Sequence, residues 1–410
     1  MSAAGANGAA TGDARPFPLR LFLFVFFGWT FDFYDLVLLG FVREHVARDL
    51  HLGHAQDRWM LGVALATSGI GGIISGRFAD KFDKRSVLSV TIVLYSVGSL
   101  ICGLAPNAWV FILGRALVGL GVGGEWAVGH GMLAEAVSPK IRGRASAALQ
   151  AGEPIGVALA AIAGFLIMPL VGWRWVMVGS SVTGLLALFV RKHMHLPPQP
   201  KHEPVSFAAL VRAKVGSRFL RAWLLGVFKL GTYWTCYTWL PTFLRDQMHQ
   251  STGKSVTWVL TAQAGQFLGM IVFGQVADKV GRRPAFSAFS LFTAVALAAL
   301  AFRWEWLAAH SVWFWSAMLL LGFGSGCTAG FGALLAELYP NEIRGVAMGA
   351  TYNLARAVQL GAPVLVGAMV DLDGLRGGLS VPLCLAIATG TWVFTLPETR
   401  GRKLTSLAEH

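Results

Sequence analysis

The chain is dominated by apolar runs long enough to cross a lipid bilayer. A membrane-spanning helix needs about 20 mostly apolar residues, and stretches of this length recur along almost the whole sequence. Six lie in the first half, near 18–42, 59–77, 86–105, 108–132, 145–169 and 174–191. Six more lie in the second half, near 221–244, 256–277, 284–302, 311–335, 346–370 and 377–395. The pattern predicts an all-α membrane protein with twelve transmembrane helices in two six-helix bundles.

The composition agrees with a membrane location. Hydrophobic residues make up 55% of the chain and charged residues only 13%, whereas a soluble domain carries roughly 25% charged residues. A net charge of +13 can indicate nucleic-acid binding, but here the basic residues lie in short loops between apolar runs. We therefore expect a lipid bilayer, and no nucleic acid, around the protein.

The distribution of Lys and Arg also predicts orientation. Basic residues gather in the loops on one side, which places that side and both termini in the cytoplasm of an inner (plasma) membrane. The predicted segments are a disordered N-terminus at 1–17, an N-terminal bundle at 18–191, a basic cytoplasmic linker at 192–220, a C-terminal bundle at 221–395 and a cytoplasmic tail at 396–410. Four tryptophans at the opposite side are predicted to anchor the helices at the membrane interface: Trp173, Trp175, Trp306 and Trp313.

The two halves share two loop motifs. GRFADKFDKRS begins at Gly76 after the second run, and GQVADKVGRRP begins at Gly274 after the eighth. AEAVSPKIRGRA begins at Ala134 after the fourth run, and AELYPNEIRGVA begins at Ala336 after the tenth. Matching motifs at matching positions indicate a transporter built from two related bundles.

The repeated motifs carry charges that can close one end of the bundle. An acid at a helix end, such as Asp80 or Asp278, can accept hydrogen bonds from the first N–H groups of a neighbouring helix, and nearby arginines can add ion pairs. Such contacts would hold one conformation shut until the bundles rock; the alternative is that the charges only fix topology. The candidate gate residues are Gly76, Asp80, Lys81, Arg85, Glu135, Arg142, Gly274, Asp278, Lys279, Arg282, Arg283, Glu337 and Arg344.

The loop motifs resemble those of the major facilitator superfamily, and the resemblance extends from Leu19 to Leu404. The family's signature, Gly-x-x-x-Asp-Arg/Lys-x-Gly-Arg-Arg/Lys, is matched in full over Gly274–Arg283. The copy over Gly76–Arg85 departs at one place, where Asp83 replaces the expected glycine. The resemblance implies the major facilitator fold, in which two bundles rock about a central site.

Three further segments resemble the sugar-porter and metabolite:proton symporter branch of that family. They are GRALVGLGVGGEW from Gly114, ELYPNEIRG from Glu337 and PETRGRKL from Pro397. Exporters of the family carry a glycine-rich signature that ends in Gly-Pro on helix five, and Val157 stands here in place of that proline. The seventh run lacks the glutamine-rich motif of sugar porters. Both departures favour uptake of a metabolite other than a sugar.

Ionisable residues inside the membrane runs of the first half each require a partner or a function. Asp32 and Asp35 are three residues apart and share one face of the first helix. Asp35 matches the helix-one acid of sugar porters, Asp32 with Asp35 resembles the Asp-x-x-Asp of aromatic-acid:proton symporters, and Arg115 matches their helix-four arginine. Since helices one and four are neighbours in that fold, the resemblance implies an Asp–Arg115 pair.

Protonation of the acid in such a pair would free the arginine and couple a proton to a conformational change. The alternative is a permanent structural ion pair. Glu125 and Glu153 are either proton relays or structural residues with satisfied hydrogen bonds. The candidates for proton coupling are therefore Asp32, Asp35, Arg115, Glu125 and Glu153.

Two cations in the second half favour an anionic substrate. Arg356 can hold a carboxylate with two parallel hydrogen bonds, and Lys229 can act as a point charge. Lys229 could instead extend toward the cytoplasm, because it lies only about two turns inside its helix. Neutral polar and aromatic residues complete the candidate substrate site: Tyr233, Tyr237, Gln263, Gln266 and Asn353.

Together these features predict proton-coupled symport of a small organic anion, a carboxylate or an aromatic acid. The alternatives are sugar or polyol:proton symport, drug or metabolite efflux, and a membrane sensor that does not transport. The sequence carries no HExxH motif, P-loop or Gly-x-Ser-x-Gly elbow, so we do not expect an enzyme. We expect no cofactor, no metal, and a monomer, because the two halves supply a complete pathway.

Overall fold

The computed structural model describes residues 17–183, 216–248 and 252–402. These residues form helices joined by short turns. Residues 1–16 of the predicted disordered N-terminus (1–17), the end of the predicted N-terminal bundle (184–191) and residues 192–215 of the predicted linker (192–220) lie outside the described residues. So does the end of the tail, 403–410.

The N-terminal half begins with four long helices: α1 (Leu19–Asp49), α2 (His54–Lys81), α3 (Lys84–Leu104) and α4 (Ala108–Ala136). The fifth crossing is irregular. It is built from α5 (Arg142–Gln150), α6 (Gly152–Ile162), a π-helical segment (Ala163–Ile167) and α7 (Met168–Val171). The sixth begins with α8 (Trp173–Ser180).

The C-terminal half repeats this order. Its helices are α11 (Gly216–Met248), α12 (Thr252–Val280), α13 (Arg282–Phe302), the short α14 (Trp304–Ala309), α15 (Ser311–Ser325), α16 (Gly330–Leu338), α17 (Arg344–Ala357) and α18 (Ala362–Trp392). A 3-10 turn joins α15 to α16 into one crossing. Helix α18 is broken at Asp373 and Gly374, where Gly374 has a φ of 53°. Its first part therefore completes the crossing begun by α17, and its second part is the last crossing.

The described residues contain eight segments long and apolar enough to cross a membrane, and the bent α17–α18 pair makes a ninth. Helices α2, α8 and α11 occupy the remaining three positions, and each reaches residues or side chains that are not described. The prediction of a twelve-helix membrane protein in two bundles is confirmed. The helices extend a few residues beyond the predicted runs, because polar ends continue the helix past the bilayer core.

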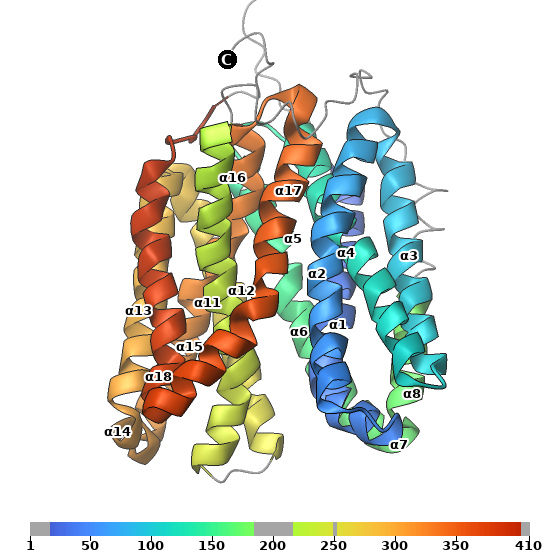
Figure 1. Ribbon diagram of the computed structural model, residues 1–410. Helices are drawn as coiled ribbons and strands as arrows, with labels where there is room; N and C mark the ends of the chain where they lie inside the picture. Colours follow the sequence, from blue (N-terminus) through green and yellow to red (C-terminus); the bar gives the residue numbers. More distant parts are fainter. Residues whose placement is uncertain (1–16, 184–215, 249–251, 403–410) are drawn as a thin grey trace, which may run out of the picture.

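The two bundles lie side by side, with α1–α8 in blue to green and α11–α18 in yellow to red (Figure 1). Helix α2 packs along α17, and α5 packs along α12. Glycines allow this close approach. A Cβ at Gly76 would lie 2.6 Å from the carbonyl oxygen of Gly345, and one at Gly274 would lie 2.6 Å from the Cβ of Ala147. Gly76 and Gly274 therefore serve the contact between halves.

The prediction of four tryptophan anchors is wrong for Trp173. Its side chain is buried, its ring packs against Phe111, and its Nε1 donates to Asp49. Trp175, Trp306 and Trp313 are exposed, as a residue at the lipid interface would be.

Candidate functional site

Asp35 is held by hydroxyl groups within the N-terminal half. Its carboxylate accepts hydrogen bonds from Ser99 of α3 and from Ser180 of α8, the latter at 3.1 Å. Arg115 of α4 donates instead to two carbonyl oxygens of α1, those of Asp35 at 3.2 Å and Leu36 at 3.1 Å. The predicted ion pair between Asp35 and Arg115 is thus not formed among the described residues. The hydroxyl groups of two serines bind the Asp35 carboxylate, and the Arg115 guanidinium binds backbone carbonyls instead.

Asp32 lies in a different environment from Asp35 despite the short spacing. It is fully buried, and neither of its carboxylate oxygens has a hydrogen-bond partner among the described residues. The Glu125 carboxylate packs against Gly28, one turn before Asp32 on α1, and is also without a described hydrogen-bond partner. Asp32 interacts electrostatically with both Glu125 and Arg356. Asp32 and Glu125 therefore form a buried acidic pair that faces the other half.

Glu153 connects the two halves through glutamine side chains. Its carboxylate accepts a hydrogen bond from Gln150 of α5 at 2.7 Å and one from Gln266 of α12 at 2.9 Å. The Oε1 atom of Gln150 accepts from Trp126 at 3.0 Å and lies 3.0 Å from Nε2 of His130. Gln150 was not among the residues predicted from the sequence; its only signal was the three-residue spacing to Glu153.

Arg356 is the most unusual cation of the interior. It is completely buried, and none of its three guanidinium nitrogens has a hydrogen-bond partner among the described residues. Its guanidinium carbon lies 5.0 Å from the ring centre of Tyr352, 5.7 Å from that of Trp29 and 5.8 Å from that of Phe33. Cation–π attraction stabilises such a charge, but it leaves every N–H donor available to a ligand.

Lys229 is a second buried cation in the C-terminal half. Its side chain is 2% exposed, and its Nζ has no described hydrogen-bond partner. The alternative in which it extends to water is therefore not observed. Lys229 and Arg356 both interact electrostatically with Glu153. Lys229 and Arg356 of the C-terminal half, neither with a hydrogen-bond partner among the described residues, thus both interact with an acid of the N-terminal half.

The other predicted substrate-binding residues have mixed environments. Tyr233 is buried and meets Phe33 edge-on, with ring centres 6.5 Å apart. Both amide atoms of Gln263 are buried without a described partner. Asn353 donates across the halves to the carbonyl of Gly123 at 2.7 Å, which gives it a contact between bundles. The side chain of Tyr237 lies outside the described residues.

One gate network is centred on Asp278 and Glu337. Asp278 accepts a hydrogen bond from the N–H of Arg144, in the first turn of α5, at 3.0 Å and forms an ion pair with Arg282 at 2.6 Å. Glu337 pairs with Arg282 at 3.0 Å and with Arg142 of the other half at 3.4 Å. The Arg282 and Glu337 side chains are at most 1% exposed. This network is buried and links the halves.

The second gate network repeats this design in a more exposed form. Asp80 accepts from the N–H groups of Gly345 at 3.2 Å and Val346 at 3.1 Å, in the first turn of α17. Glu135 pairs with Lys84 at 2.7 Å and Arg344 at 3.4 Å, and its side chain is 27% exposed. The two networks are therefore unequal, although the motifs that encode them are alike.

Four predicted gate residues lie at the edges of these networks. Lys81 lies over the ring of Phe82, and Arg283 lies over that of Phe394. Arg85 pairs with Asp83 at 3.2 Å, and Lys279 is exposed. The central bonds of the two networks are thus made by other members of the motifs.

A strap formed by residues 398–402 follows the last helix and closes over the buried network. Glu398 accepts from the N–H groups of Arg282 at 2.8 Å and Arg283 at 3.0 Å, as well as from two N–H groups within the strap. Burial raises the pKa of Glu398, but these four N–H donors outweigh it and hold the pKa below its usual range. Thr399 donates to Glu337 at 2.8 Å, and Arg142 donates to the carbonyl of Arg402 at 3.1 Å.

The two loop motifs differ at one backbone position, which leads to a first prediction. Gly281 has a φ of 111°, and a Cβ there would lie 2.8 Å from Glu398; Asp83 has an ordinary φ of −59°. We expect Gly281→Ala to destabilise the protein by about 1–3 kcal/mol and Asp83→Gly to change its stability by less than about 1 kcal/mol. Denaturant unfolding of both variants in detergent micelles measures this; equal losses of stability would contradict it.

The chain is similar to known transporters over most of its length. The family model described as Major Facilitator Superfamily matches residues 21–262 and 249–409. A putative metabolite transport protein of Haemophilus influenzae is 30% identical over 92% of this chain and 95% of that protein. A probable 4-methylmuconolactone transporter of Cupriavidus pinatubonensis is 28% identical over 93% of this chain and 91% of that protein.

The fold has a close counterpart among solved structures. The proton:xylose symporter XylE bound to 6-bromo-6-deoxy-D-glucose superposes with a TM-score of 0.78 and covers 96% of this chain and 98% of that one, at 18% sequence identity. Sequence and structure agree that this is a multi-pass membrane transporter and not an enzyme. The chain belongs to the major facilitator superfamily.

Proposed function

We propose that the protein takes up a small organic anion, a carboxylate or an aromatic acid, together with protons by alternating access. The observation that carries this proposal is Arg356. A buried cation without a hydrogen-bond partner is costly, and a carboxylate offers the guanidinium two parallel hydrogen bonds. The rings of Trp29, Phe33 and Tyr352 provide apolar faces beside that carboxylate. The site therefore suits an anion with a flat or apolar body.

The relatives support a small metabolite as the substrate. They are named as carriers of a metabolite and of 4-methylmuconolactone. The likeness to the xylose symporter supports the fold alone, because the sequence identity is 18%. That comparison therefore gives no support to sugar as the substrate.

Proton coupling follows from competition for the two cations. Asp32 and Glu153 interact electrostatically with Arg356, and Glu153 also interacts with Lys229. A substrate anion must compete with these carboxylates, and a proton that binds one of them removes the competing charge. Asp32 is the better proton carrier than Asp35, because serines already satisfy the Asp35 carboxylate. Anion and proton then bind together more favourably than either alone.

Alternating access in this proposal uses the two bundles as moving units. Residues 18–191 and 221–395 rock about the Arg356 region while the Asp80 and Asp278 networks open and close one end. The basic loops support cytoplasmic termini in an inner membrane. A monomer is the working unit of this proposal, because the two halves supply a complete pathway.

Uptake into vesicles tests the proposal. Purified protein in lipid vesicles would be given labelled benzoate, lactate or a hexose, with and without an inward-directed proton gradient. We expect the gradient to stimulate uptake of an acid and Asp32→Asn to abolish that stimulation, with Asp83→Asn, an exposed acid in a loop, as the control. Uptake of hexose alone, or uptake of an acid at the same rate with and without the proton gradient, would refute the proposal.

A further inference from the structure

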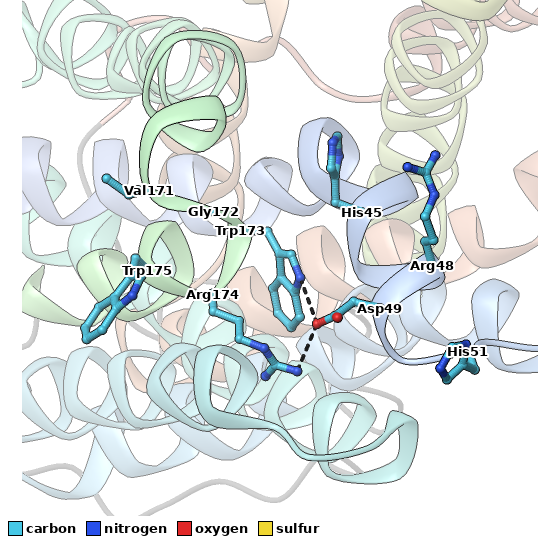
Figure 2. Close-up of a pocket in the computed structure, with 9 residues that line it drawn as sticks. All are labelled: His45, Arg48, Asp49, His51, Val171, Gly172, Trp173, Arg174 and Trp175. Atoms are coloured by element: carbon cyan, nitrogen blue, oxygen red, sulfur yellow. Dashed lines mark hydrogen bonds and ion pairs between the residues drawn. The ribbon is translucent and has the colours of Figure 1, made fainter.

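A cavity of about 600 Å³ opens at the far end of the N-terminal half (Figure 2). It lies between the last turns of α1 and the turn from α7 to α8. Figure 1 shows α7 and α8 at the end of the bundle opposite the C-terminus, and the strap before the C-terminus closes over the Asp278 gate. The cavity is thus separate from both gates and from the Arg356 region.

One wall of the cavity is locked by its own contacts. Asp49 accepts a hydrogen bond from Trp173 Nε1 at 3.3 Å and forms an ion pair with Arg174 at 3.0 Å. Arg174 also donates to the carbonyl of Ala105 at 2.7 Å, and its guanidinium lies 4.4 Å from the ring centre of Trp173. Asp49 is the acid of the lining, and its charge is therefore already balanced by Arg174.

The end of α1 and the turn after it present polar donors that the described protein does not use. His45 and Arg48 are three residues apart and share one face of the end of α1, and His51 follows in the turn. All three are exposed, and no hydrogen bond or ion pair of their side chains occurs among the described residues. His51 has a φ of 50°, a conformation that L residues seldom adopt. Since Arg174 offsets Asp49, Arg48 gives the lining residues a net positive charge.

We propose that this cavity is a second binding site for a small organic anion, which it captures before the anion enters the central pathway. Arg48 would bind the carboxylate, the imidazole N–H groups would add hydrogen bonds, and the exposed ring of Trp175 would cover the apolar body. The proposal rests on the proposed function only for the identity of the anion as the transported substrate. Binding at the cavity is measured independently of transport.

Photolabelling locates the site directly. Purified protein in nanodiscs of zwitterionic lipid would be irradiated with 4-benzoylbenzoate, an aromatic carboxylate that cross-links on illumination, and digested for mass spectrometry. We expect labels within residues 45–51 or 171–175 that benzoate displaces, that persist in Arg356→Gln and that fall at least about fivefold in Arg48→Gln. Labels at these residues that Arg48→Gln leaves unchanged would overturn the proposal.

A lipid headgroup is the competing anion. The same labelling would be repeated in nanodiscs that contain phosphatidylglycerol. We expect unchanged labelling if the cavity takes soluble organic anions. Loss of the label in the anionic lipid would show that a phosphate headgroup occupies the cavity, and it would overturn the proposal.

Transport kinetics give a second, separable measurement. At low ionic strength we expect Arg48→Gln to raise KM for the acid about threefold to tenfold and to leave kcat unchanged, because capture depends on a long-range charge. Arg303→Gln removes an exposed positive charge from the C-terminal half and is expected to leave KM unchanged. An equal change of KM in both variants would overturn the proposal. If no acid is transported but the photolabel persists at the cavity, the proposed transport function is wrong and anion binding at the cavity is still supported.

Discussion

Replacing Arg356 with glutamine is expected to reduce kcat/KM for acid uptake by about 100-fold or more. Truncating a desolvated charge that holds a ligand costs about 2–5 kcal/mol. Arg356 is completely buried with three unpaired nitrogens, so a bound carboxylate would receive its strongest hydrogen bonds there. The measurement is initial uptake of labelled benzoate into vesicles over a range of concentrations.

Two controls separate loss of the anion site from loss of the fold. Thermal unfolding of Arg356→Gln should still be cooperative and occur at a similar temperature, because the guanidinium makes no hydrogen bond to the described residues that the substitution would break. Arg356→Lys keeps the positive charge but loses the planar guanidinium that donates two parallel hydrogen bonds. It should therefore retain only part of the uptake activity. Uptake by Arg356→Gln within about threefold of the wild type would exclude this residue as the anchor.

Replacing Asp278 with asparagine is expected to open the gate at the α5–α12 contact. The substitution removes the acid that contacts Arg144 of the other half, through the backbone N–H at 3.0 Å and the side chain at 3.5 Å. It also removes the charge that holds the buried Arg282 beside Glu337, and truncating one member of a buried charged network across an interface costs about 2–5 kcal/mol. A change of about 3 kcal/mol shifts an equilibrium between closed and open states by more than about 100-fold. Spin labels at Lys140 and Lys279, both exposed, should report a longer and broader distance. The exposed Cys384 would first be replaced by serine.

The Asp80→Asn variant is the matched control for this prediction. Asp80 accepts two backbone hydrogen bonds in the first turn of α17, and losing such a capping interaction costs about 0.5–2 kcal/mol. Its expected effect on the closed population is therefore at least about tenfold smaller. Equal opening in both variants, or greater opening in Asp80→Asn, would contradict the inequality of the two networks.

The fold was predictable because its signals are local. A run of apolar residues marks each crossing wherever it lies in the chain, and this rule located helices as different as the regular α3 and the broken crossing of α17 and α18. The paired loop motifs likewise indicated which segments correspond between halves. The break at Asp373 and Gly374 falls in the gap between the predicted runs 346–370 and 377–395. What these signals did not include is the 3-10 turn at Val358–Gly361, which interrupts the predicted run 346–370.

The interior of the site was less predictable because its partners are distant in sequence. The serines that hold Asp35 lie 64 and 145 residues away, and nothing in their local sequence distinguishes them from other small helix residues. Gln150 was not predicted for the same reason, because its partner Trp126 lies 24 residues away. The inequality of the gate networks was also hidden, because burial of Glu337 depends on a strap that packs over it from the end of the chain.

That strap has a practical consequence for how the protein is handled. Arg142 of the first half donates to the carbonyl of Arg402, so the segment after the last helix takes part in the contact between the two halves. A shortened clone that stops after Leu396 would lack Glu398 and Thr399, whose hydrogen bonds hold the strap to Arg282, Arg283 and Glu337. Reporter fusions and purification handles are better attached beyond residue 402, through a flexible spacer, than directly after the last helix.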